Sequence, residues 1–144
     1  MTAQKMWDCY AAEANITADY DAWAFGDQPD VLAQLVLSGV KTGTASLALF
    51  YDLEGEELPL EGQYSVILNE KEEAVCIIQT TKVSVMPFYA VSASHAYREG
   101  EGDRSLEYWR KVHEEFFQKE LSAEGLAFSE TMDVVCEEFI RVYP

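Results

Sequence analysis

The sequence predicts an α+β protein with a curved, mostly antiparallel sheet, or a small β-barrel, flanked by helices. Helical patterns near the N-terminus are followed by several strand patterns, a long helix and a closing strand. Strands and helices do not alternate strictly, which disfavours a parallel βαβ sheet. The 144 residues and 49% hydrophobic content fit one folded domain. We therefore expect a single domain over residues 1–144, with residues 1–21 as a helical N-terminal extension.

The N-terminal region is predicted from its periodicity. Residues 3–14 carry Met6 and Tyr10 on one helical face, which indicates a helix. Residues 15–21 are expected to form a loop, and residues 23–27 an aromatic turn that leads into the next helix.

A second helix is indicated by its start and stop signals. Pro29 suits the first helical position after a cap at Asp27 or Gln28. Leu32 belongs to the apolar face of this segment. Gly39 suits the left-handed stop that ends many helices.

The central region is rich in strand patterns. Residues 42–51 contain Thr, Ser, Leu and aromatic side chains and predict a strand. Residues 64–68 and 75–86 predict two more strands, the second of them long. Residues 52–57 and 69–73 are polar and are expected to form turns.

The C-terminal third begins with a short helix predicted over residues 94–98. A long helix follows over residues 104–120, with Asp103 as a reasonable N-cap and a mostly aromatic buried stripe. Residues 132–143 predict the closing strand.

The charge of the chain limits the classes of partner. A net charge of −16 argues against a broad phosphate-binding surface, because nucleic-acid affinity usually depends on clustered Lys and Arg. It leaves room for a small nucleoside or nucleotide in a pocket, or for one basic groove on an acidic body. The simplest interpretation is that the acidic residues keep the protein soluble.

Other compositional features argue against several kinds of site. The three cysteines form no C-x-x-C pair, so their spacing predicts neither a metal site nor a catalytic thiol. We expect no cofactor. No apolar run is long enough to cross a bilayer, and the N-terminus lacks the apolar stretch of a signal peptide. We expect a cytoplasmic protein with no membrane partner, and the sequence leaves its oligomeric state open.

The clearest chemical signal is a lysine and a threonine where a helix meets a strand. Lys41 and Thr44 lie at i, i+3 in the segment Gly-Val-Lys-Thr-Gly-Thr. Lysine is seldom buried without a partner. Glu99, Glu101 and Asp103 in a glycine-punctuated loop offer carboxylates. The two segments together suggest a small polar pocket.

Four motifs give the chain a resemblance to the ASCH domains, the activating-signal-cointegrator homology family of the PUA-like superfold. In chain order they are Trp-Ala-Phe-Gly-Asp at 23–27, Ser-Gly-Val-Lys-Thr-Gly-Thr-Ala-Ser-Leu at 38–47, Glu-Gly-Glu-Gly-Asp-Arg-Ser-Leu-Glu-Tyr-Trp at 99–109 and Val-Cys-Glu-Glu-Phe at 135–139.

The resemblance implies a PUA-like barrel with a cleft between barrel and helices, and a small nucleoside or short RNA as ligand. One branch resembles amidohydrolases that remove the acetyl group of N4-acetylcytidine with a Lys, a Thr three residues later and a distant Glu. Lys41, Thr44 and Glu99 match that catalytic set. The branch has an arginine two residues beyond the threonine, where this chain has Ser46, so the substrate stays open.

Two interpretations of these three residues remain. In the catalytic one, Thr44 is the nucleophile, Lys41 is its base if burial favours the uncharged amine, and Glu99 shuttles a proton or orients the lysine. Nearby carboxylates would oppose the uncharged amine, leaving Lys41 as a cation that binds a carbonyl or phosphate oxygen. In the structural interpretation, Lys41 and Glu99 form only a salt bridge.

Further candidates and alternatives accompany this set. Arg104 pairs with a neighbouring carboxylate or contacts an oxyanion, and Ser105 caps the long helix or reaches the ligand. His95 and His113 have no evident partners for a metal site or a triad. The alternative functions are a non-catalytic RNA-binding module and a ribonuclease that uses Lys41 and Ser105. The candidate ligand-binding residues are Trp23, Phe25, Ser46, Glu101, Asp103, Arg104 and Ser105.

Overall fold

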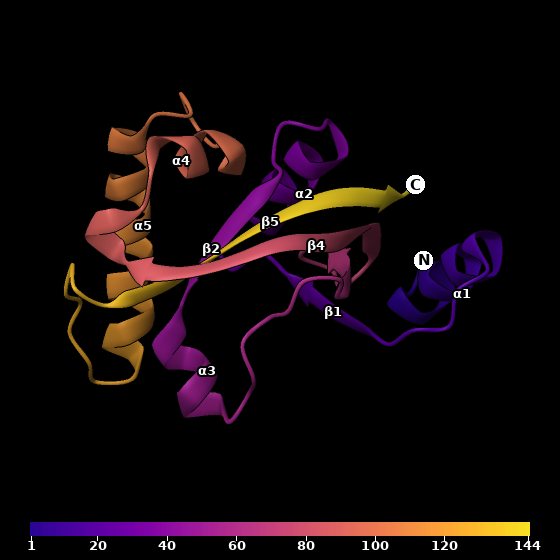
Figure 1. Cartoon of the computed structure of the whole chain (residues 1–144), viewed down its shortest axis with the longest axis horizontal. Helices are drawn as coiled ribbons and strands as arrows, with labels where there is room; N and C mark the ends of the chain where they lie inside the picture. Colours follow the sequence, from indigo (N-terminus) through magenta and orange to yellow (C-terminus); the bar gives the residue numbers. More distant parts are fainter.

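A computed structural model describes residues 1–144, which form one curled sheet with helices around it (Figure 1). The α+β class expected from the sequence is confirmed. None of the helices has the length and hydrophobicity that crossing a membrane requires. The elements are α1 (Ala3–Ala14), β1 (Tyr20–Ala24), α2 (Pro29–Leu37), β2 (Gly43–Leu47), α3 (Ala48–Glu54), β3 (Tyr64–Leu68), β4 (Ala74–Pro87), a 3-10 turn (Phe88–Ala90), α4 (Ala93–Glu99), α5 (Leu106–Ala123) and β5 (Asp133–Tyr143).

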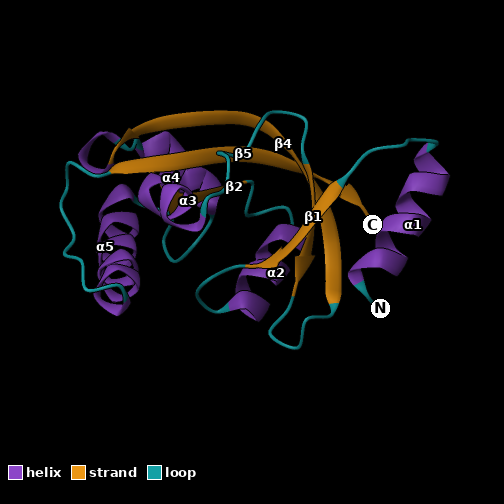
Figure 2. Ribbon diagram, turned by 90° about the horizontal axis from the view of Figure 1, so that it is seen from below, coloured by secondary structure: helices purple, strands orange, loops and turns teal.

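The sheet is an incomplete barrel. Its strand order is β1-β3-β4-β5-β2, with β1 parallel to β3 and every other pair antiparallel. The long strands β4 and β5 arch over α2 and α3 (Figure 2). The edge strands β1 and β2 do not pair with each other, so each keeps one side without a strand neighbour.

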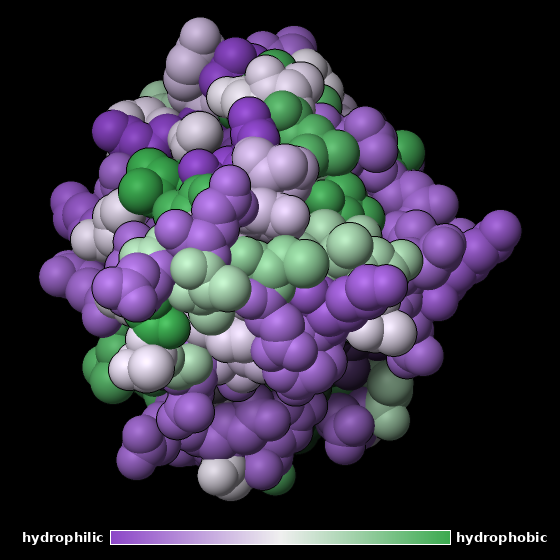
Figure 3. Space-filling view, turned by 90° about the vertical axis from the view of Figure 1, so that its right-hand side faces the viewer, coloured by the Kyte–Doolittle hydropathy of each residue, from purple (hydrophilic) through white to green (hydrophobic).

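Helices α1 and α2 cover opposite faces of β3 and β4. Successive strand residues point to opposite faces of a sheet. Val66 and Ile77 accordingly pack against Trp7 of α1, whereas Ile67 and Ile78 belong to the core cluster of α2. Every one of these side chains is at least nine-tenths buried. The α1 end of the molecule exposes mainly hydrophilic residues, with smaller hydrophobic areas between them (Figure 3).

Helix α5 closes the other end of the sheet (Figure 2). Its aromatic stripe, expected from the sequence, is buried: Trp109 and Phe117 pack with Leu47 of β2 and Val134 of β5. This packing fixes α5 beside α4, whose last residue is Glu99.

The predicted strand over residues 42–51 is wrong in its second half. The strand ends at Leu47, and residues 48–54 form α3, so part of the expected turn at 52–57 is helical. Gly55 ends α3 in the left-handed conformation, with φ of 67°. The Tyr51 hydroxyl lies 2.9 Å from the Ser46 hydroxyl, and this contact links α3 to β2.

Three smaller predictions also differ from the structure. The expected loop and aromatic turn contain β1, because pairing with β3 orders residues that carry no clear strand pattern of their own. Gln28 is the N-cap of α2 but makes no side-chain cap bond. Ser105, not Asp103, caps α5 by accepting from the Tyr108 amide, so that helix spans residues 106–123.

Gly100 allows the chain after α4 to approach the Lys41 segment. Its φ is 76°, and a Cβ there would lie 2.7 Å from the Val40 carbonyl oxygen. Gly55 has a similar φ at the end of another seven-residue helix, but a Cβ there would meet nothing within 4 Å. Comparing the same substitution at Gly55 and Gly100 therefore separates the effect of backbone strain from that of a steric clash.

We expect Gly100→Ala to destabilise the fold more than Gly55→Ala. Both changes impose the left-handed strain of roughly 1 to 2 kcal/mol, but only Gly100→Ala adds a backbone clash, on the order of a further 1 to 3 kcal/mol. Urea denaturation of both variants measures the difference. Equal losses would mean that the Val40 segment moves away freely.

Candidate functional site

Backbone hydrogen bonds fix the segment between α2 and β2 that carries Lys41. The Lys41 amide donates to the Leu35 carbonyl at 3.0 Å, and the Thr42 amide donates to the Arg98 carbonyl at 2.7 Å. The Thr42 carbonyl accepts from the Phe139 amide at 3.0 Å. Backbone hydrogen bonds alone therefore hold the Lys41 segment against α4 and β5, without any contact from the lysine side chain.

The Lys41 side chain is buried with two carboxylate partners. Its Nζ lies 3.3 Å from Glu99 Oε1 and 3.2 Å from Glu101 Oε2, and the residue is 1% exposed. The same nitrogen is 5.1 Å from the centre of the Phe25 ring. Buried charges are tolerated only when paired and hydrogen-bonded, and this arrangement meets that condition.

Glu99 is the centre of the cluster, because each of its carboxylate oxygens has two partners. Oε1 faces Lys41 and, at 3.4 Å, Nε2 of His113. Oε2 lies 2.8 Å from Nε2 of His95 and accepts from the Trp109 indole N–H at 2.5 Å. Burial alone would raise the pKa of this carboxyl, but Lys41 and His113 outweigh it and hold the pKa well below its usual range.

The surroundings of His113 favour its charged form. Its Nδ1 lies 2.9 Å from the Trp109 carbonyl oxygen, and its Nε2 faces the Glu99 carboxylate. Two acceptors require two N–H donors, which only the imidazolium has. Burial lowers the pKa of His113, but Glu99 more than compensates, and the pKa is raised overall.

Both histidines thus have a carboxylate partner in Glu99, and for His113 the expectation that it has no partners for a metal site is wrong. The α4 and α5 helices bring both imidazoles to Glu99 from different sides. Glu99, Glu101 and His113 also have ligand atoms within 4.8 Å of one another, a spacing that a metal ion could use. The Lys41 amine contacts both of these carboxylates and already supplies a positive charge there.

A small chamber of about 50 Å³ lies beside this cluster and is adjacent to a wide cleft of about 710 Å³. Lys41, Thr44 and Glu99 all line the chamber, together with Glu101 and His113. The two cavities have five lining residues in common, which shows that they are adjacent. The shared residues are Phe25, Gly26, Thr44, Ala45 and Phe116.

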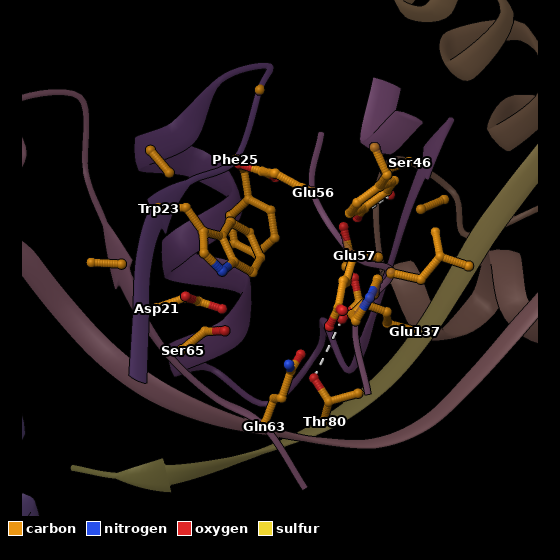
Figure 4. A pocket seen from close by; sticks show the side chains of 18 of the residues that line it. Asp21, Trp23, Phe25, Ser46, Glu56, Glu57, Gln63, Ser65, Thr80 and Glu137 are labelled. Atoms are coloured by element: carbon orange, nitrogen blue, oxygen red, sulfur yellow. Dashed lines mark hydrogen bonds between the residues drawn. The ribbon is translucent and has the colours of Figure 1, made fainter. Parts of the chain in front are cut away.

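The wide cleft lies between the edge strands β1 and β2 (Figure 4). Trp23 and Phe25 stand on one side, with Ser46 and Glu137 opposite them. The Thr80 hydroxyl on the floor donates to Glu137 Oε1 at 3.3 Å. Burial raises the pKa of Glu137, and the bond from Thr80 partly offsets this. No lysine, arginine or histidine lines the cleft.

Most of the residues singled out in the sequence lie on these cavities. Trp23 is half-buried on the cleft wall, whereas Phe25 is a core residue whose ring faces Lys41. The half-buried Glu101 lines the chamber with Thr44. Ser46 lines the cleft, with its hydroxyl against Tyr51.

Asp103, Arg104 and Ser105 do not line either cavity. Arg104 pairs with no carboxylate, contrary to one expectation. It donates to the carbonyls of Tyr97 and Val40, and its guanidinium lies 3.6 Å from the centre of the Tyr97 ring. The Ser105 amide donates to Asp103 Oδ1 at 2.9 Å. These residues shape the loop that carries Glu101.

Sequence reasoning missed Glu137 and the histidine partners of Glu99. His95 and Glu99 are four residues apart, a spacing that places both on one helix face. His113 shares the buried face of α5 with Trp109. Glu137 follows a buried strand run and gives no local signal, because its neighbours come from β2 and β4.

Comparisons with known proteins agree with this architecture. The family profile described as the ASCH domain matches residues 21–143. That match covers most of the chain. The chain belongs to the ASCH domain family.

Two solved structures resemble this ASCH domain closely. A protein from Enterococcus faecalis has 38% identity and a TM-score of 0.90, over 97% of this chain and 87% of that one. An ASCH domain from Lactobacillus crispatus has 33% identity and a TM-score of 0.86, over 98% and 94%. The curled sheet with its helices is thus the PUA-like fold. No curated protein matches the chain.

The charged state of His113 gives this ASCH domain a testable pH dependence. Because the folded pKa of His113 is raised above 6.5, its stabilising contribution is fully present below pH 6.5 and is lost as the pH rises through the folded pKa. We expect wild-type protein to be more stable than His113→Phe at pH 6, by a margin that shrinks towards pH 9. Chemical denaturation at both pH values measures that margin, and a constant margin would contradict a charged His113.

Proposed function

We propose that the cleft binds a nucleoside, free or at an exposed position of a short RNA, and that the adjoining chamber hydrolyses an acyl group from it. The observation that carries this is that Lys41, Thr44 and Glu99, from two distant segments, line one chamber that is adjacent to the cleft. N4-acetylcytidine is the probe substrate that the family resemblance suggests.

The sizes of the two cavities suit this division. The chamber has room for only a few water molecules, and so for an acyl carbonyl group but not for a nucleoside. The cleft is in the range of small-molecule sites. Trp23 on its wall offers an indole face on which a base can stack.

In the proposed reaction, the Thr44 oxygen attacks the acyl carbon and its proton passes to an uncharged Lys41 amine. The C–N bond then breaks, and the same amine returns that proton to the leaving nitrogen. Water hydrolyses the resulting Thr44 ester, which releases the carboxylic acid and restores the hydroxyl. One amide and one water thus give one acid and one amine.

The partners of Glu99 suit a positioning role better than proton transfer. Its oxygens already accept from Lys41, His95, His113 and Trp109, and its lowered pKa makes it a weak base. Glu101 has a half-buried carboxylate on the same lysine. Both acids favour the ammonium form, so hydrolysis requires a ligand that weakens these contacts, whereas plain binding of a carbonyl oxygen does not.

Turnover of N4-acetylcytidine by purified protein tests this proposal, with cytidine and acetate measured by chromatography. We expect Thr44→Val to lower kcat by at least about 100-fold, because it removes the nucleophile and keeps the branched shape. Thr81→Val, on an exposed part of β4, is the matched control and should leave kcat unchanged. Equal turnover by Thr44→Val and wild type would contradict the assignment of Thr44 as the nucleophile.

Lys41→Met is the companion variant, and its fold must be checked by circular dichroism. Removing one partner of a buried pair costs roughly 3 to 5 kcal/mol of stability. A folded but inactive Lys41→Met protein would support the catalytic role, whereas a folded protein with wild-type kcat would refute it.

A non-catalytic RNA-binding role is the second candidate. Tyr97 is 58% exposed, the Arg104 guanidinium lies over its ring, and Arg98 is on the same helix. Exposed aromatic and arginine side chains together suit single-stranded RNA. This alternative predicts salt-sensitive binding to short RNA hairpins with no product formed, and loss of that binding in Tyr97→Ala.

A further inference from the structure

We propose that the cleft selects its ligand by charge: it accepts neutral or positively charged nucleosides and rejects phosphorylated ones, and Glu137 is the main discriminating side chain. This inference rests on the proposed nucleoside site and narrows it to free nucleosides over nucleotides and RNA. It concerns the cleft, whereas the proposed hydrolysis takes place in the chamber.

The charges around the cleft all have one sign. Five carboxylates line it, from β1, the segment after α3, α5 and β5, and no basic side chain lies among them. Three of these residues are exposed, so solvent and salt screen their repulsion of a phosphate, whereas Glu120 and Glu137 are half-buried and their repulsion is screened less. The five residues are Asp21, Glu56, Glu57, Glu120 and Glu137.

The cleft also presents polar groups that point to a ligand. Ser65 is 7% exposed, and in Figure 4 its oxygen faces the cavity without a hydrogen bond to the other side chains drawn there. The Trp23 indole nitrogen is turned into the same space. No buried side-chain oxygen lacks a hydrogen-bond partner, so the Ser65 hydroxyl is open to the cavity and free to bond a ligand or water there. These two groups suit the polar edge of a base or sugar.

Glu137 lines the cleft, where its carboxylate can contact such a ligand. It is half-buried on β5 opposite Thr44, and only Thr80 donates to its side chain. No cation pairs with it, unlike its neighbour Glu138, which contacts Arg98 at 3.1 Å and Lys82 at 3.9 Å. A carboxylate with free acceptor capacity favours an amino group or a cation and disfavours a phosphate.

Ser46 occupies the position at which the family resemblance would place an arginine, so this wall of the cleft lacks that basic group. Its hydroxyl contacts Tyr51, so the position that an arginine takes in the amidohydrolase branch is neutral here. The cleft of this chain therefore has no counter-charge for a phosphate.

A matched ligand series tests the inference by isothermal titration calorimetry on the full chain. The probes are 5′-amino-5′-deoxycytidine, cytidine and cytidine 5′-monophosphate, which share a base and differ in charge. We expect affinity to fall in that order, with at least about a tenfold difference between the amine and the monophosphate at low salt. The difference should shrink in 0.5 M salt. Equal affinities, tighter binding of the monophosphate, or no binding of any probe would overturn the inference.

Two variants assign the selectivity to one residue. Glu137→Gln keeps the size and the acceptor for Thr80 but removes the charge, and we expect it to reduce the amine-to-monophosphate ratio by at least about threefold. Glu138→Gln makes the same charge change at the next position, off the cleft, and should keep the wild-type ratio. Equal ratios in the two variants would remove Glu137 from the role.

Hydrolysis is measured separately, so that the two proposals can fail independently. Charge-ordered binding without turnover of N4-acetylcytidine would refute the hydrolase and leave the charge selection standing. Turnover of N4-acetylcytidine and of its 5′-monophosphate with equal kcat/KM would support the hydrolase and refute the charge selection.

Discussion

The buried contact between the Lys41 ammonium and the Glu99 carboxylate is the constraint on which the rest of the site depends. Two charges removed from water are stable together only if every remaining hydrogen-bonding position is filled. Here His95, His113 and Trp109 fill the remaining acceptor positions of the Glu99 carboxylate. Glu101 provides the Lys41 amine with a second carboxylate partner. These groups come from α4, α5 and the loops beside them, so the ion pair ties the helical end of the protein to the start of β2.

The open seam of the sheet provides the space of the wide cleft. A closed barrel would have paired β1 with β2 and filled the gap with side chains. In this ASCH domain the two strands stay apart, and the cleft lies between them. Edge strands keep unpaired backbone donors and acceptors on one side, which adds polar capacity to the walls. Thr44, on one side of this seam, lines both the cleft and the chamber.

The two cavities differ in charge. The chamber holds a buried lysine and a histidine with a raised pKa next to its acids, whereas the cleft is lined by carboxylates alone among charged groups. Positive groups beside the chamber suit an oxygen on which negative charge develops. The acidic cleft suits a ligand body without phosphate. A net charge of −16 therefore excludes fewer classes of ligand than it first suggests, because binding depends on how the charged side chains are distributed around each cavity.

The sequence by itself determined the elements with strong local signals and the catalytic candidates. Pro29 and Gly39 marked α2, and runs of strand-type residues marked β3 and β4. The family resemblance pointed to Lys41, Thr44 and Glu99. Tertiary structure alone decided β1, which is ordered by pairing with β3, the histidine and tryptophan partners of Glu99, and the partner of Glu137. The reason is physical: a helix cap or periodicity acts over a few residues, whereas the environment of a buried charge is built from segments up to 60 residues apart.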